Sequence, residues 1–569
     1  MAEYFSPGVY VEEFDSGTQS LSGVSTSTAG FIGLAQRGPI EGSPVLIKSL
    51  ANFRRTFGSY LSATTFGSYR FLAYAVEQFF LNGGSTCYVM RVAPSDAVAA
   101  SNSNSSALSV IAKNPGGWGN DVRVLITPAS KAKTQILEVI ASGTYRVKSN
   151  AGFVAGDTVT FVAGGKTQVL KVISAKDNTI VLSGELEGDP VDAGLLPAKV
   201  LSTSEFNIQV SYGDDSETFE KCSLNVEAAN YVEKVTGTSN LVSIAVGTIA
   251  DATGTAFEAV TNAEELATDL TFFLQGGSDG TIEALGQDDF IGKDLGPGNR
   301  GGINAFIEND EVSIMAIPGV TEPAVLFALI AHCESRGDRF AILDIPREKT
   351  KVADVLAYRN YFDTSYAAMY NPWVQVSDPL EKRNVYIPPS GTVAGIYARV
   401  DDARGVQKAP ANETLRGVTG LDVQYSVTEQ DLLNPQGVNL IRSFTGQGIR
   451  VWGARTCSSN QLWKYVNVRR LFIFIETAIL RGTNWVVFEP NDDPLWARVR
   501  RTVDTFLTRV WRDGALAGAS ASEAFYVNIG RDTMTQDDID NGRLICVIGI
   551  APVKPAEFVV FRITQKTSE

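Results

Sequence analysis

Residues 312–346 read VSIMAIPGVTEPAVLFALIAHCESRGDRFAILDIP, and this stretch decides the fold class. Two apolar runs, VSIMAIPG (Val312–Gly319) and FAILDIP (Phe340–Pro346), predict buried strands. Between them, PAVLFALIAHCESRG (Pro323–Gly337) predicts a helix, with proline in its first turn and glycine after its end. Because parallel strands need a crossover connection, this strand–helix–strand order indicates a mostly parallel sheet.

The same alternation continues on both sides of this stretch. KVADVLAYRNYF (Lys351–Phe362) predicts the next helix, and YAAMYNPWVQV (Tyr366–Val376) predicts the next strand. Earlier in the chain, AGFIGLA (Ala29–Ala35) and CYVMRV (Cys87–Val92) predict strands that flank a helix in RFLAYAVEQFFLNGG (Arg70–Gly84). The chain is therefore expected to be a mixed α/β, multidomain protein.

Residues 98–275 interrupt this pattern. They are rich in Val, Thr, Gly and Asp, and they hold 12 Lys and Arg against 20 Asp and Glu. Short alternating runs recur between turn signals, as in DTVTFVAGG (Asp157–Gly165), TQVLKVI (Thr167–Ile173) and FNIQVSYGD (Phe206–Asp214). We expect an acidic, β-rich insert with some helix near its end.

Composition excludes several classes of protein. The chain has 569 residues, enough for three or four domains, and a formal net charge of −14, so a nucleic-acid-binding surface is not expected. Five scattered cysteines with no CxxC pair indicate neither a disulfide framework nor a zinc site, and they suit a reducing compartment. The chain does not open with the pattern of a secretory signal. The run LFIFIETAIL (Leu471–Leu480) is too short to span a membrane and predicts a buried strand that passes into a helix.

The only histidine, His332, stands beside Cys333. Neighbouring residues on a helix diverge by about 100°, so these two side chains are not expected to act together as a thiol nucleophile and its base. A single histidine also argues against a Ser-His-Asp triad and against a histidine-based zinc site. We interpret both residues as structural.

Other polar motifs have equally plain interpretations. GPGNRGG (Gly296–Gly302) lacks the GxxxxGK[ST] pattern of a phosphate loop, and a surface loop is favoured. The acidic pairs Asp401–Asp402 and Asp537–Asp538 are typical of solvated turns. No catalytic, metal or cofactor site is predicted.

One segment has a distinctive charge pattern, NDDPLWARVRRTVDTFLTRVWRDG (Asn491–Gly514). It predicts an amphipathic helix with an apolar stripe made of Leu495, Trp496, Val499, Val503, Phe506, Leu507, Val510 and Trp511. Four arginines lie on the opposite side: Arg498, Arg501, Arg509 and Arg512. Arg500 stands i,i+4 from Asp504 and is expected to pair with it.

Two interpretations of this arginine face stay open on spacing alone: a solvated helix face, or a docking helix for an acidic protein partner. Residues 441–512 hold 12 Lys and Arg against 5 Asp and Glu, although the whole chain is acidic. This separation of charge favours the docking helix.

Both ends of the chain carry strand-like segments. PGVYVEE (Pro7–Glu13) alternates as a strand, but a Ser/Thr/Gly-rich linker (Ser16–Gly30) follows it and offers no hairpin partner. EFVVFRITQ (Glu557–Gln565) is similar. A strand left alone has unpaired backbone groups, so each segment either docks on its own domain or pairs elsewhere.

The segments of the C-terminal third, taken in order with the two termini, resemble the tail sheath proteins of contractile phages and of related contractile injection systems. The resemblance covers both ends and nearly all of residues 371–569. It is carried by SPGVYVEE (Ser6–Glu13), LQGGSDG (Leu274–Gly280), IPPSGTVAGIYARVDDARGVQKAPANE (Ile387–Glu413), LNPQGVNLIRSFTGQGIRVWGART (Leu433–Thr456), WKYVNVRRLFIFIE (Trp463–Glu476), the Asn491–Gly514 helix and APVKPAEFVVFRI (Ala551–Ile563).

The resemblance implies a structural protein that is not an enzyme and needs no cofactor. Sheath subunits form stacked six-fold rings around an inner tube and contract to drive the tube through a target cell envelope, which serves genome or effector ejection. The implied partners are other copies of the chain, the inner tube protein, and baseplate and tail terminator or cap proteins, with no nucleic acid and no direct membrane insertion. The implied place is the cytoplasm of a bacterial host, and then a phage tail or injection-system particle.

The resemblance also assigns roles to residues. The N-terminal arm (Val9, Tyr10, Val11 and Glu12) and the C-terminal arm (Phe558, Val559, Val560, Phe561 and Ile563) would add strands to the sheet of a neighbouring subunit, with the linker after the first arm as a hinge. Arg498, Arg501, Arg509 and Arg512 would face acidic residues of the inner tube.

These inferences divide the chain into five parts. We expect an N-terminal arm and linker (1–27), an α/β sheath core domain (28–97 plus 276–370), a β-rich inserted outer domain (98–275), a C-terminal α+β sheath domain that faces the tube (371–552) and a C-terminal arm (553–569). Two alternatives are a nucleotide-binding α/β enzyme centred on Val312–Val376, and a baseplate or terminator protein that shares the sheath C-terminal domain.

Overall fold

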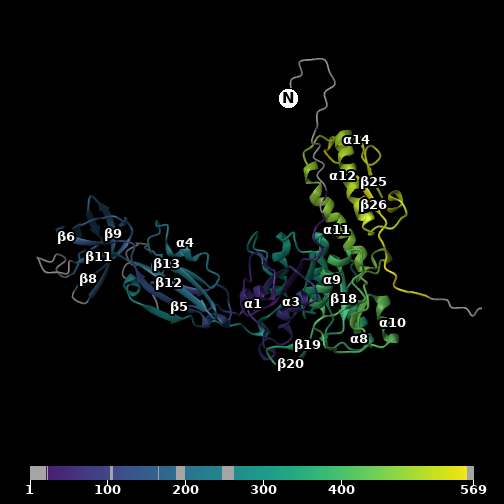
Figure 1. Ribbon diagram of the computed structural model, residues 1–569, viewed down its shortest axis with the longest axis horizontal. Coiled ribbons are helices and arrows are strands. Elements are labelled where there is room, and N and C mark those ends of the chain that lie inside the picture. Colours follow the sequence, from purple (N-terminus) through teal and green to yellow (C-terminus); the bar gives the residue numbers. More distant parts are fainter. Residues whose placement is uncertain are drawn as a thin grey trace, which may run out of the picture.

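The computed structural model describes residues 21, 23–102, 107–163, 166–187, 199–246 and 262–560. Three parts are visible in Figure 1: a central core, a long β-rich arm that extends to one side of it, and a narrow helical lobe that stands above it. The core and the lobe come mainly from the two ends of the chain, and the arm comes from the middle.

The core is built on a nine-stranded sheet. Its inner strands run parallel from β3 to β23, and antiparallel strands complete both edges. Every residue of β1, β16, β17 and β18 is buried, as expected for parallel strands covered on both faces. In spatial order the strands are β2 (Val45–Ile47), β3 (Cys87–Val92), β1 (Ala29–Leu34), β16 (Ile314–Ala316), β17 (Phe340–Asp344), β18 (Ala367–Asn371), β23 (Val438–Phe444), β24 (Gly448–Val451) and β21 (Glu413–Thr414).

Helices cover both faces of this sheet. The sheet side chains alternate between two clusters: Phe31 and Ile342 pack with the helices of one face, and Ile32 and Leu343 pack with those of the other. The first face is covered by α1 (Leu50–Phe57), α3 (Leu72–Leu81) and α9 (Ser390–Arg404); the second by α6 (Gln287–Ile291), α7 (Pro323–Arg336) and α8 (Val352–Arg359). Nearby lie α2 (Ala63–Phe66), α10 (Val427–Leu433) and a small sheet of β20 (Arg383–Ile387), β19 (Val374–Asp378) and β22 (Gly420–Leu421).

Two glycines let α3 and α9 approach closely. A Cβ at Gly391 would lie 2.4 Å from the Cα of Ala75, and one at Gly395 would lie 2.5 Å from the carbonyl oxygen of Phe79. Both neighbours are backbone atoms, so nothing can move aside. The sequence SGTVAG at the start of α9 is therefore a packing requirement of the core.

The core sheet continues past residue 370. β18 pairs in parallel with β23, and β23 then pairs with β24, so strands up to Val451 belong to the same sheet as β1. A domain boundary between residues 370 and 371 would cut through the pairing of these strands. The separate helical lobe begins only with α11 (Val466–Gly482).

The strand predicted within Leu471–Leu480 is wrong. These residues lie wholly inside α11, with Leu471, Ile473 and Ile475 buried and Glu476 part of the same helix. An apolar run of this length does not distinguish a buried helix from a buried strand, because burial on several sides removes the periodicity.

The arm holds two β-structures. Near the core, a four-stranded sheet of β13 (Asp215–Cys222), β12 (Glu205–Tyr212), β5 (Arg123–Ala129) and β15 (Leu270–Phe273) packs with the β14–β4 pair (Val242–Val246 and Leu108–Ala112) and with α4 (Val232–Thr236). Beyond it lies a closed six-stranded barrel in the order β10 (Thr179–Leu182), β7 (Thr144–Val147), β6 (Lys133–Ala141), β11 (Val200–Thr203), β8 (Thr158–Ala163) and β9 (Lys166–Lys176).

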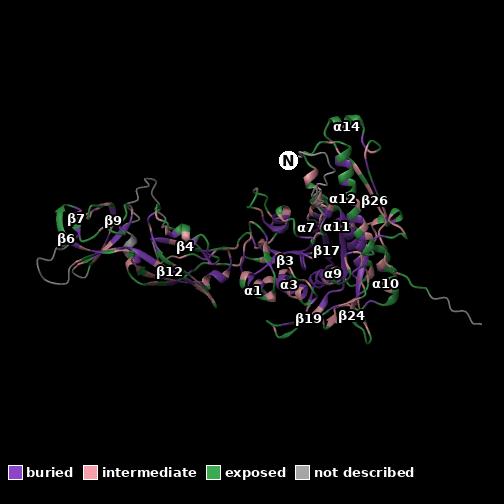
Figure 2. Cartoon of the chain, turned by 45° about the horizontal axis from the view of Figure 1, so that its top comes forward, coloured by how far each residue is buried: buried purple, intermediate pink, exposed green. Residues whose placement is uncertain are grey.

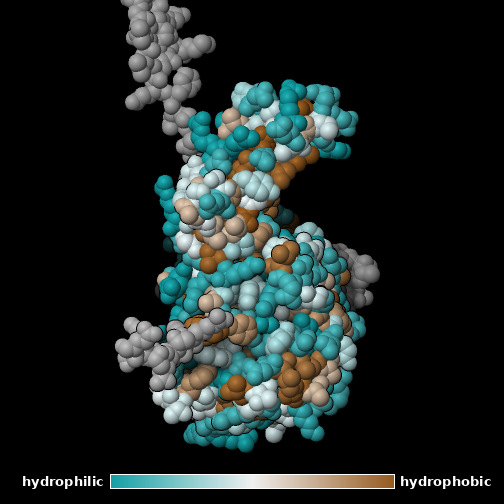
Figure 3. Space-filling view, turned by 90° about the vertical axis from the view of Figure 1, so that its right-hand side faces the viewer, coloured by the Kyte–Doolittle hydropathy of each residue, from teal (hydrophilic) through white to brown (hydrophobic). Residues whose placement is uncertain are grey.

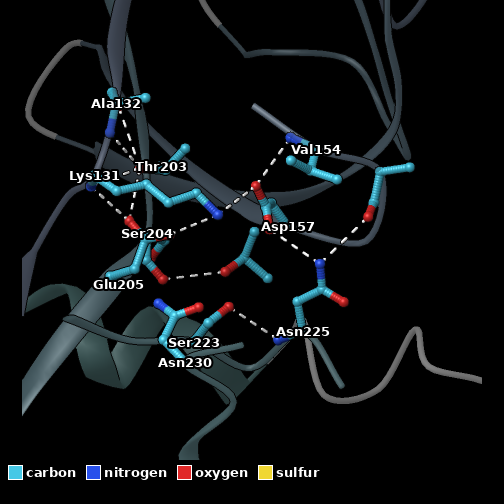
Figure 4. Close-up of polar contacts among 12 residues, drawn as sticks. Lys131, Ala132, Val154, Asp157, Thr203, Ser204, Glu205, Ser223, Asn225 and Asn230 are labelled. Carbon is cyan, nitrogen blue, oxygen red and sulfur yellow. Dashed lines mark hydrogen bonds and ion pairs between the residues drawn. The ribbon is translucent and has the colours of Figure 1, made fainter. Parts of the chain in front are cut away.

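A buried polar cluster joins the barrel to the four-stranded sheet (Figure 4). The Lys131 Nζ lies 2.8 Å from Asp157 Oδ2 and 3.5 Å from Glu205 Oε1, and both carboxylate side chains are nearly inaccessible to solvent. Asp157 also accepts from the Asn225 side chain and the Val154 amide. One lysine thus bridges a carboxylate of the barrel and a carboxylate at the start of β12.

Two buried arginines join the arm to the core. Arg91 on β3 donates to the carbonyl oxygens of Ala35 in the core and of Pro115 in the arm, at 2.9 and 2.7 Å. Arg37 forms an ion pair with Asp215 and lies over the ring of Tyr212. Because these contacts cross between the core and the arm, they fix the direction in which the arm leaves the sheet.

The lobe is built from two long helices and a hairpin-like pair of strands. α11 and α12 (Asp493–Arg512) pack side by side, and β25 (Phe525–Ile529) and β26 (Cys546–Ile550) cover α12 through Val527, Ile529 and Ile548. The short helix α13 (Ala521–Ala524) lies between α12 and β25, and α14 (Gln536–Asp540) lies between the two strands. Figure 2 shows buried residues concentrated in the core, whereas the tip of the lobe around α14 is exposed.

Candidate assembly surfaces

The predicted amphipathic helix is present as α12, and the predicted apolar stripe is its buried face. The Asp492 side chain accepts from the Leu495 amide and caps the helix, and proline stands in the first turn. Seven of the eight predicted stripe residues are buried, and Trp511 is half-buried. The arginines consequently lie on the exposed side.

The four arginines of this face do not have the same surroundings. Arg498 pairs with Glu489 at 2.8 Å and lies over the ring of Trp485, and Arg509 donates to the carbonyl oxygen of Leu21 at 2.6 Å. The guanidinium groups of Arg501 and Arg512 have no hydrogen-bond or ion-pair partner among the described residues. Two of the four charges are therefore available to a partner.

The predicted ion pair between Arg500 and Asp504 does not form. Arg500 instead donates to the carbonyl oxygen of Ile529 at the end of β25, at 2.9 Å, which ties α12 to the strand. Burial raises the pKa of Asp504, and the positive charge of Arg500 only partly opposes this. The backbone acceptor is closer to Arg500 than its helix neighbour is, because β25 packs directly against α12.

A groove of about 830 Å³ runs along the exposed side of α12 and is closed at one edge by Ile529 and Gly530. Asp493, Asp504 and Asp513 line it together with the arginines. The basic excess of residues 441–512 is also partly internal, since Arg455 and Arg470 are buried and paired with Glu557 and Asp401. The exposed face of α12 is thus mixed in charge, with Arg501 and Arg512 as its unpaired cations among the described residues.

The β25–β26 pair presents free edges. Within the described residues each of these strands pairs only with the other, so the outer edge of each has unpaired backbone groups. Tyr526 and Val547 on the outward face are 54% and 42% exposed. Figure 3 shows hydrophobic side chains in a band along the narrow lobe. This two-stranded sheet has the form of one part of a larger sheet.

The C-terminal arm begins at a strong anchor. Phe558, Val559 and Val560 are exposed and lie in no strand of this chain, while Phe561 and Ile563 fall outside the described residues. Just before them, Glu557 accepts from Arg455, Asn434 and Tyr465. Burial would raise the pKa of Glu557, but these hydrogen bonds and the charge of Arg455 lower it to about 2.

The N-terminal strand residues Val9, Tyr10, Val11 and Glu12 lie outside the described residues. The described part of the linker that follows them packs on the lobe: Leu21 is 3% exposed, and Thr26 is hydrogen-bonded to both Arg470 and Asp401. Backbone and side-chain contacts thus hold the described residues of this segment in place in the single chain.

The polar motifs interpreted as structural occupy structural positions. His332 and Cys333 point to different surroundings on α7; burial and the nearby charge of Arg339 lower the pKa of His332 to about 4, and burial raises the pKa of Cys333 to about 12. The interpretation of the acidic pairs as solvated turns is wrong: Asp401 lies in α9 with its side chain 4% exposed and paired with Arg470, and Asp538 lies in α14, where it forms a capping box with Thr535. In the described part of the chain, no group of His, Cys, Asp or Glu has an arrangement that could hold a metal ion, and no helix has the length and apolarity to cross a membrane.

The crevice at the carboxyl ends of β16, β17 and β18 is where open parallel sheets often bind nucleotides. Here it is lined by Arg70, Arg347 and Arg383, each of which is paired with a carboxylate of this chain. No observation there favours the nucleotide-binding alternative.

Two anchoring contacts could not be predicted from the sequence. Arg455 and Glu557 stand 102 residues apart, and Leu21 and Arg509 stand 488 apart. Neither pair has a local spacing signal, and one of the contacts uses a backbone carbonyl. The only sequence signal for them is indirect: each lies where a terminal strand-like segment meets the C-terminal third.

Comparison with known proteins places the chain in a family. The profile of the phage tail sheath protein central domain matches residues 297–457, and that of the phage tail sheath C-terminal domain matches residues 458–566. An N-terminal domain described as DUF2586 matches residues 7–277. The border between the two profiles, at residues 457 and 458, falls between the last strand of the core sheet and α11. The core and the lobe are divided at the same place in the structure.

Two relatives and one solved structure illustrate the similarity. A putative prophage major tail sheath protein of Pseudomonas aeruginosa (strain UCBPP-PA14) is 27% identical over 48% of this chain and 71% of its own length. The tail sheath protein of Escherichia phage P2 is 26% identical over 47% and 69%. The sheath of the PVC extracellular contractile injection system, solved in its contracted state, shares the fold with a TM-score of 0.53, at 21% identity over 100% of this chain and 99% of that one.

The two tail sheath profiles together cover residues 297–566, and the curated relatives are tail sheath proteins, which are structural subunits of a contractile tail. The chain belongs to the contractile tail sheath family. The resemblance inferred from the sequence motifs is thereby confirmed, as is the mixed α/β, multidomain fold class.

Proposed function

We propose that copies of this chain stack as six-membered rings around an inner tube and that their contraction drives the tube through a target cell envelope. The observation that carries the proposal is the β25–β26 pair, whose outer edges are unpaired among the described residues of the chain. An unpaired edge is a template for a strand from another chain. The arms around Val9–Glu12 and Phe558–Ile563 supply such strands.

The arms connect copies in a head-to-tail sense. A strand that leaves one subunit and completes the sheet of the next uses two different surfaces, and such heterologous contacts generate rings or helices. Phe558, Val559 and Val560 are exposed and unpaired in the single chain, which is the state expected of an arm without its partner. The root of the N-terminal arm packs on the lobe that carries the acceptor sheet, and the root of the C-terminal arm is anchored where the lobe meets the core.

The exposed side of α12 meets acidic residues of the inner tube. Arg501 and Arg512 make the direct contacts, because Arg498 and Arg509 are engaged within the chain. Exposed ion pairs contribute only about 0–1 kcal/mol each. Weak contacts repeated in every subunit hold the sheath on the tube and still allow release on contraction.

This arrangement also implies where the other parts of the chain lie in the sheath. The core and lobe form the inner, tube-facing wall, and the arm of residues 98–275 projects outward. Baseplate and terminator or cap proteins close the two ends of the sheath. The particle assembles in the cytoplasm of a bacterial host, as part of a phage tail or an injection system, and it works without catalysis or a cofactor.

Electron microscopy of the purified full-length protein tests polymerisation. We expect hollow helical tubes, alone or on addition of the inner tube protein. A variant that lacks residues 1–20 should form none, and this deletion stops short of Leu21, so the packed lobe stays intact. A variant with Arg531→Glu, an exposed arginine of the same lobe, is the matched control and should assemble normally. Tubes from the truncated protein, or none from the full chain with the inner tube present, contradict the proposal.

A further inference from the structure

The described start of the chain runs along α11. Thr26 accepts from Arg470 through its carbonyl oxygen at 2.8 Å, Gly23 lies against Phe474, and Leu21 lies against Gly482. From residue 26 to 21 an extended chain covers roughly 16 Å, and from residue 470 to 482 a helix rises roughly 18 Å. The segment therefore follows the second half of α11 almost to its end.

Leu21 is inserted into a socket at the end of α11. Its side chain is 3% exposed and belongs to the apolar cluster of α11 and α12. A Cβ added at Gly482 would lie only 1.8 Å from the Leu21 Cδ2, so glycine is what makes room for it. Arg509 of α12 donates to the Leu21 carbonyl oxygen at 2.6 Å and closes the socket.

The C-terminal arm is anchored at the other end of α11. Tyr465 is the N-cap residue of the helix, and its hydroxyl donates to Glu557 at 3.0 Å. Asn467, in the first turn, donates to the carbonyl oxygen of Val553 at 3.2 Å. Arg455 contacts both carboxylate oxygens of Glu557, each at 2.7 Å.

We infer that α11 is a rigid strut that fixes the two arms at their roots, with Leu21 seated over Gly482 at one end and Glu557 held by Arg455 and Tyr465 at the other. The inference rests on the proposed function for the role of the arms. α11 has 17 residues, so the two roots are separated by roughly 25 Å of helix, most of it buried. Tension from one neighbouring subunit to the next then passes along this helix and, at the Glu557 end, also reaches the core through Arg455, which is hydrogen-bonded to Asn439 of β23.

This assignment changes the role of Arg509. On the sequence it belongs to the tube-facing arginines, but its guanidinium is used to hold the root of the N-terminal arm. Arg509 is a positioning residue for the arm, whereas Arg501 and Arg512 remain available to the tube. The two roles predict different consequences for substitutions on the same helix.

Hydrogen exchange of the full-length, unassembled protein tests the socket directly. Gly482 has ordinary helical backbone, so Gly482→Ala is opposed only by Leu21. We expect Gly482→Ala to raise exchange in residues 23–28 about tenfold and leave the core strands unchanged. Leu480→Ala, at an exposed position of the same helical turn, is the control and should leave exchange unchanged both in residues 23–28 and in the core strands.

A second substitution keeps the test decisive. Leu21→Ala removes the atom that a Cβ at residue 482 would strike. The rise in hydrogen exchange in the double variant, Leu21→Ala with Gly482→Ala, should therefore be smaller than the sum of the rises in the two single variants. Strictly additive effects on exchange, or unchanged exchange in Gly482→Ala, would contradict the assignment of Leu21 to a socket over Gly482. Because this readout needs no polymer, it is independent of whether the chain forms a sheath.

The other root and the mechanical role have their own readouts. Glu557→Ala should raise exchange in residues 553–560 and leave residues 23–28 protected, since the anchors stand at opposite ends of α11. In electron microscopy, Gly482→Ala should yield tubes that are shorter or irregular, with inner-tube binding retained. If tubes of Gly482→Ala match the wild type although the segment is released, α11 does not act as a strut, even where polymerisation itself is established.

Discussion

The guanidinium group of Arg455 contacts both carboxylate oxygens of Glu557, with Nε–Oε1 and Nη2–Oε2 distances of 2.7 Å each. The Arg455 side chain is 8% exposed and that of Glu557 is 18% exposed. This two-point contact joins the end of the core domain to the root of the C-terminal arm. The contact holds the described chain in the folded structure up to Glu557. The described residues that follow Glu557 have no comparable partner.

The Glu557 contact predicts a dependence of stability on pH. Its pKa in the folded protein is about 2, below the ordinary glutamate value of 4.5, so the stabilisation is complete above the unfolded value and is lost as the pH falls through the folded value. Glu557→Gln should lower the free energy of unfolding by about 1–2 kcal/mol at pH 7. Urea denaturation from pH 7 down to pH 3 measures the difference between the two proteins, which should shrink on acidification. A difference that stays constant with pH contradicts the assignment.

The junction between the barrel and the four-stranded sheet of the β-rich arm depends on one lysine, Lys131. Lys131→Met leaves Asp157 and Glu205 buried without a cation, and loss of one partner from a buried ion pair typically costs about 3–5 kcal/mol. We expect the insert to unfold at lower temperature in calorimetry and to become sensitive to protease near residues 129–133 and 203–205. Lys133→Met, an exposed lysine two residues away, is the control and should behave as the wild type.

The crossing of α3 and α9 has no room for a side chain at residue 391. Gly391→Ala places a Cβ 2.4 Å from the Ala75 backbone, and overpacking of this kind typically costs about 1–3 kcal/mol. The loss should appear as a lower midpoint of urea denaturation. Ser335→Ala on the exposed side of α7 provides the comparison, and equal midpoints for the two variants would show that the helices can separate without penalty.

The parts that sequence could predict are those specified by local periodicity. The buried strands Ala29–Leu34 and Phe340–Asp344 and the apolar stripe of α12 follow from alternation and helical spacing. The strand predicted at the start of Leu471–Leu480 is wrong because this part of α11 is buried on several sides and so has no clear period. The partners of Arg500 and Arg509 were missed because both are backbone carbonyls brought near only by tertiary packing.

The α12 arginines should separate into two functional classes. Arg501→Glu with Arg512→Glu reverses the two charges without partners among the described residues, so it should abolish co-sedimentation with the inner tube while sheath-to-sheath contacts survive. Because exposed ion pairs are screened by salt, binding of the wild type should also weaken between about 0.05 and 0.5 M salt. Arg509→Gln should instead retain tube binding and loosen residues 23–28 in hydrogen exchange, since it loses its bond to the Leu21 carbonyl. If Arg509→Gln loses the tube as completely as the double variant does, the whole basic face belongs to the tube contact, and the separation of roles along α12 is wrong.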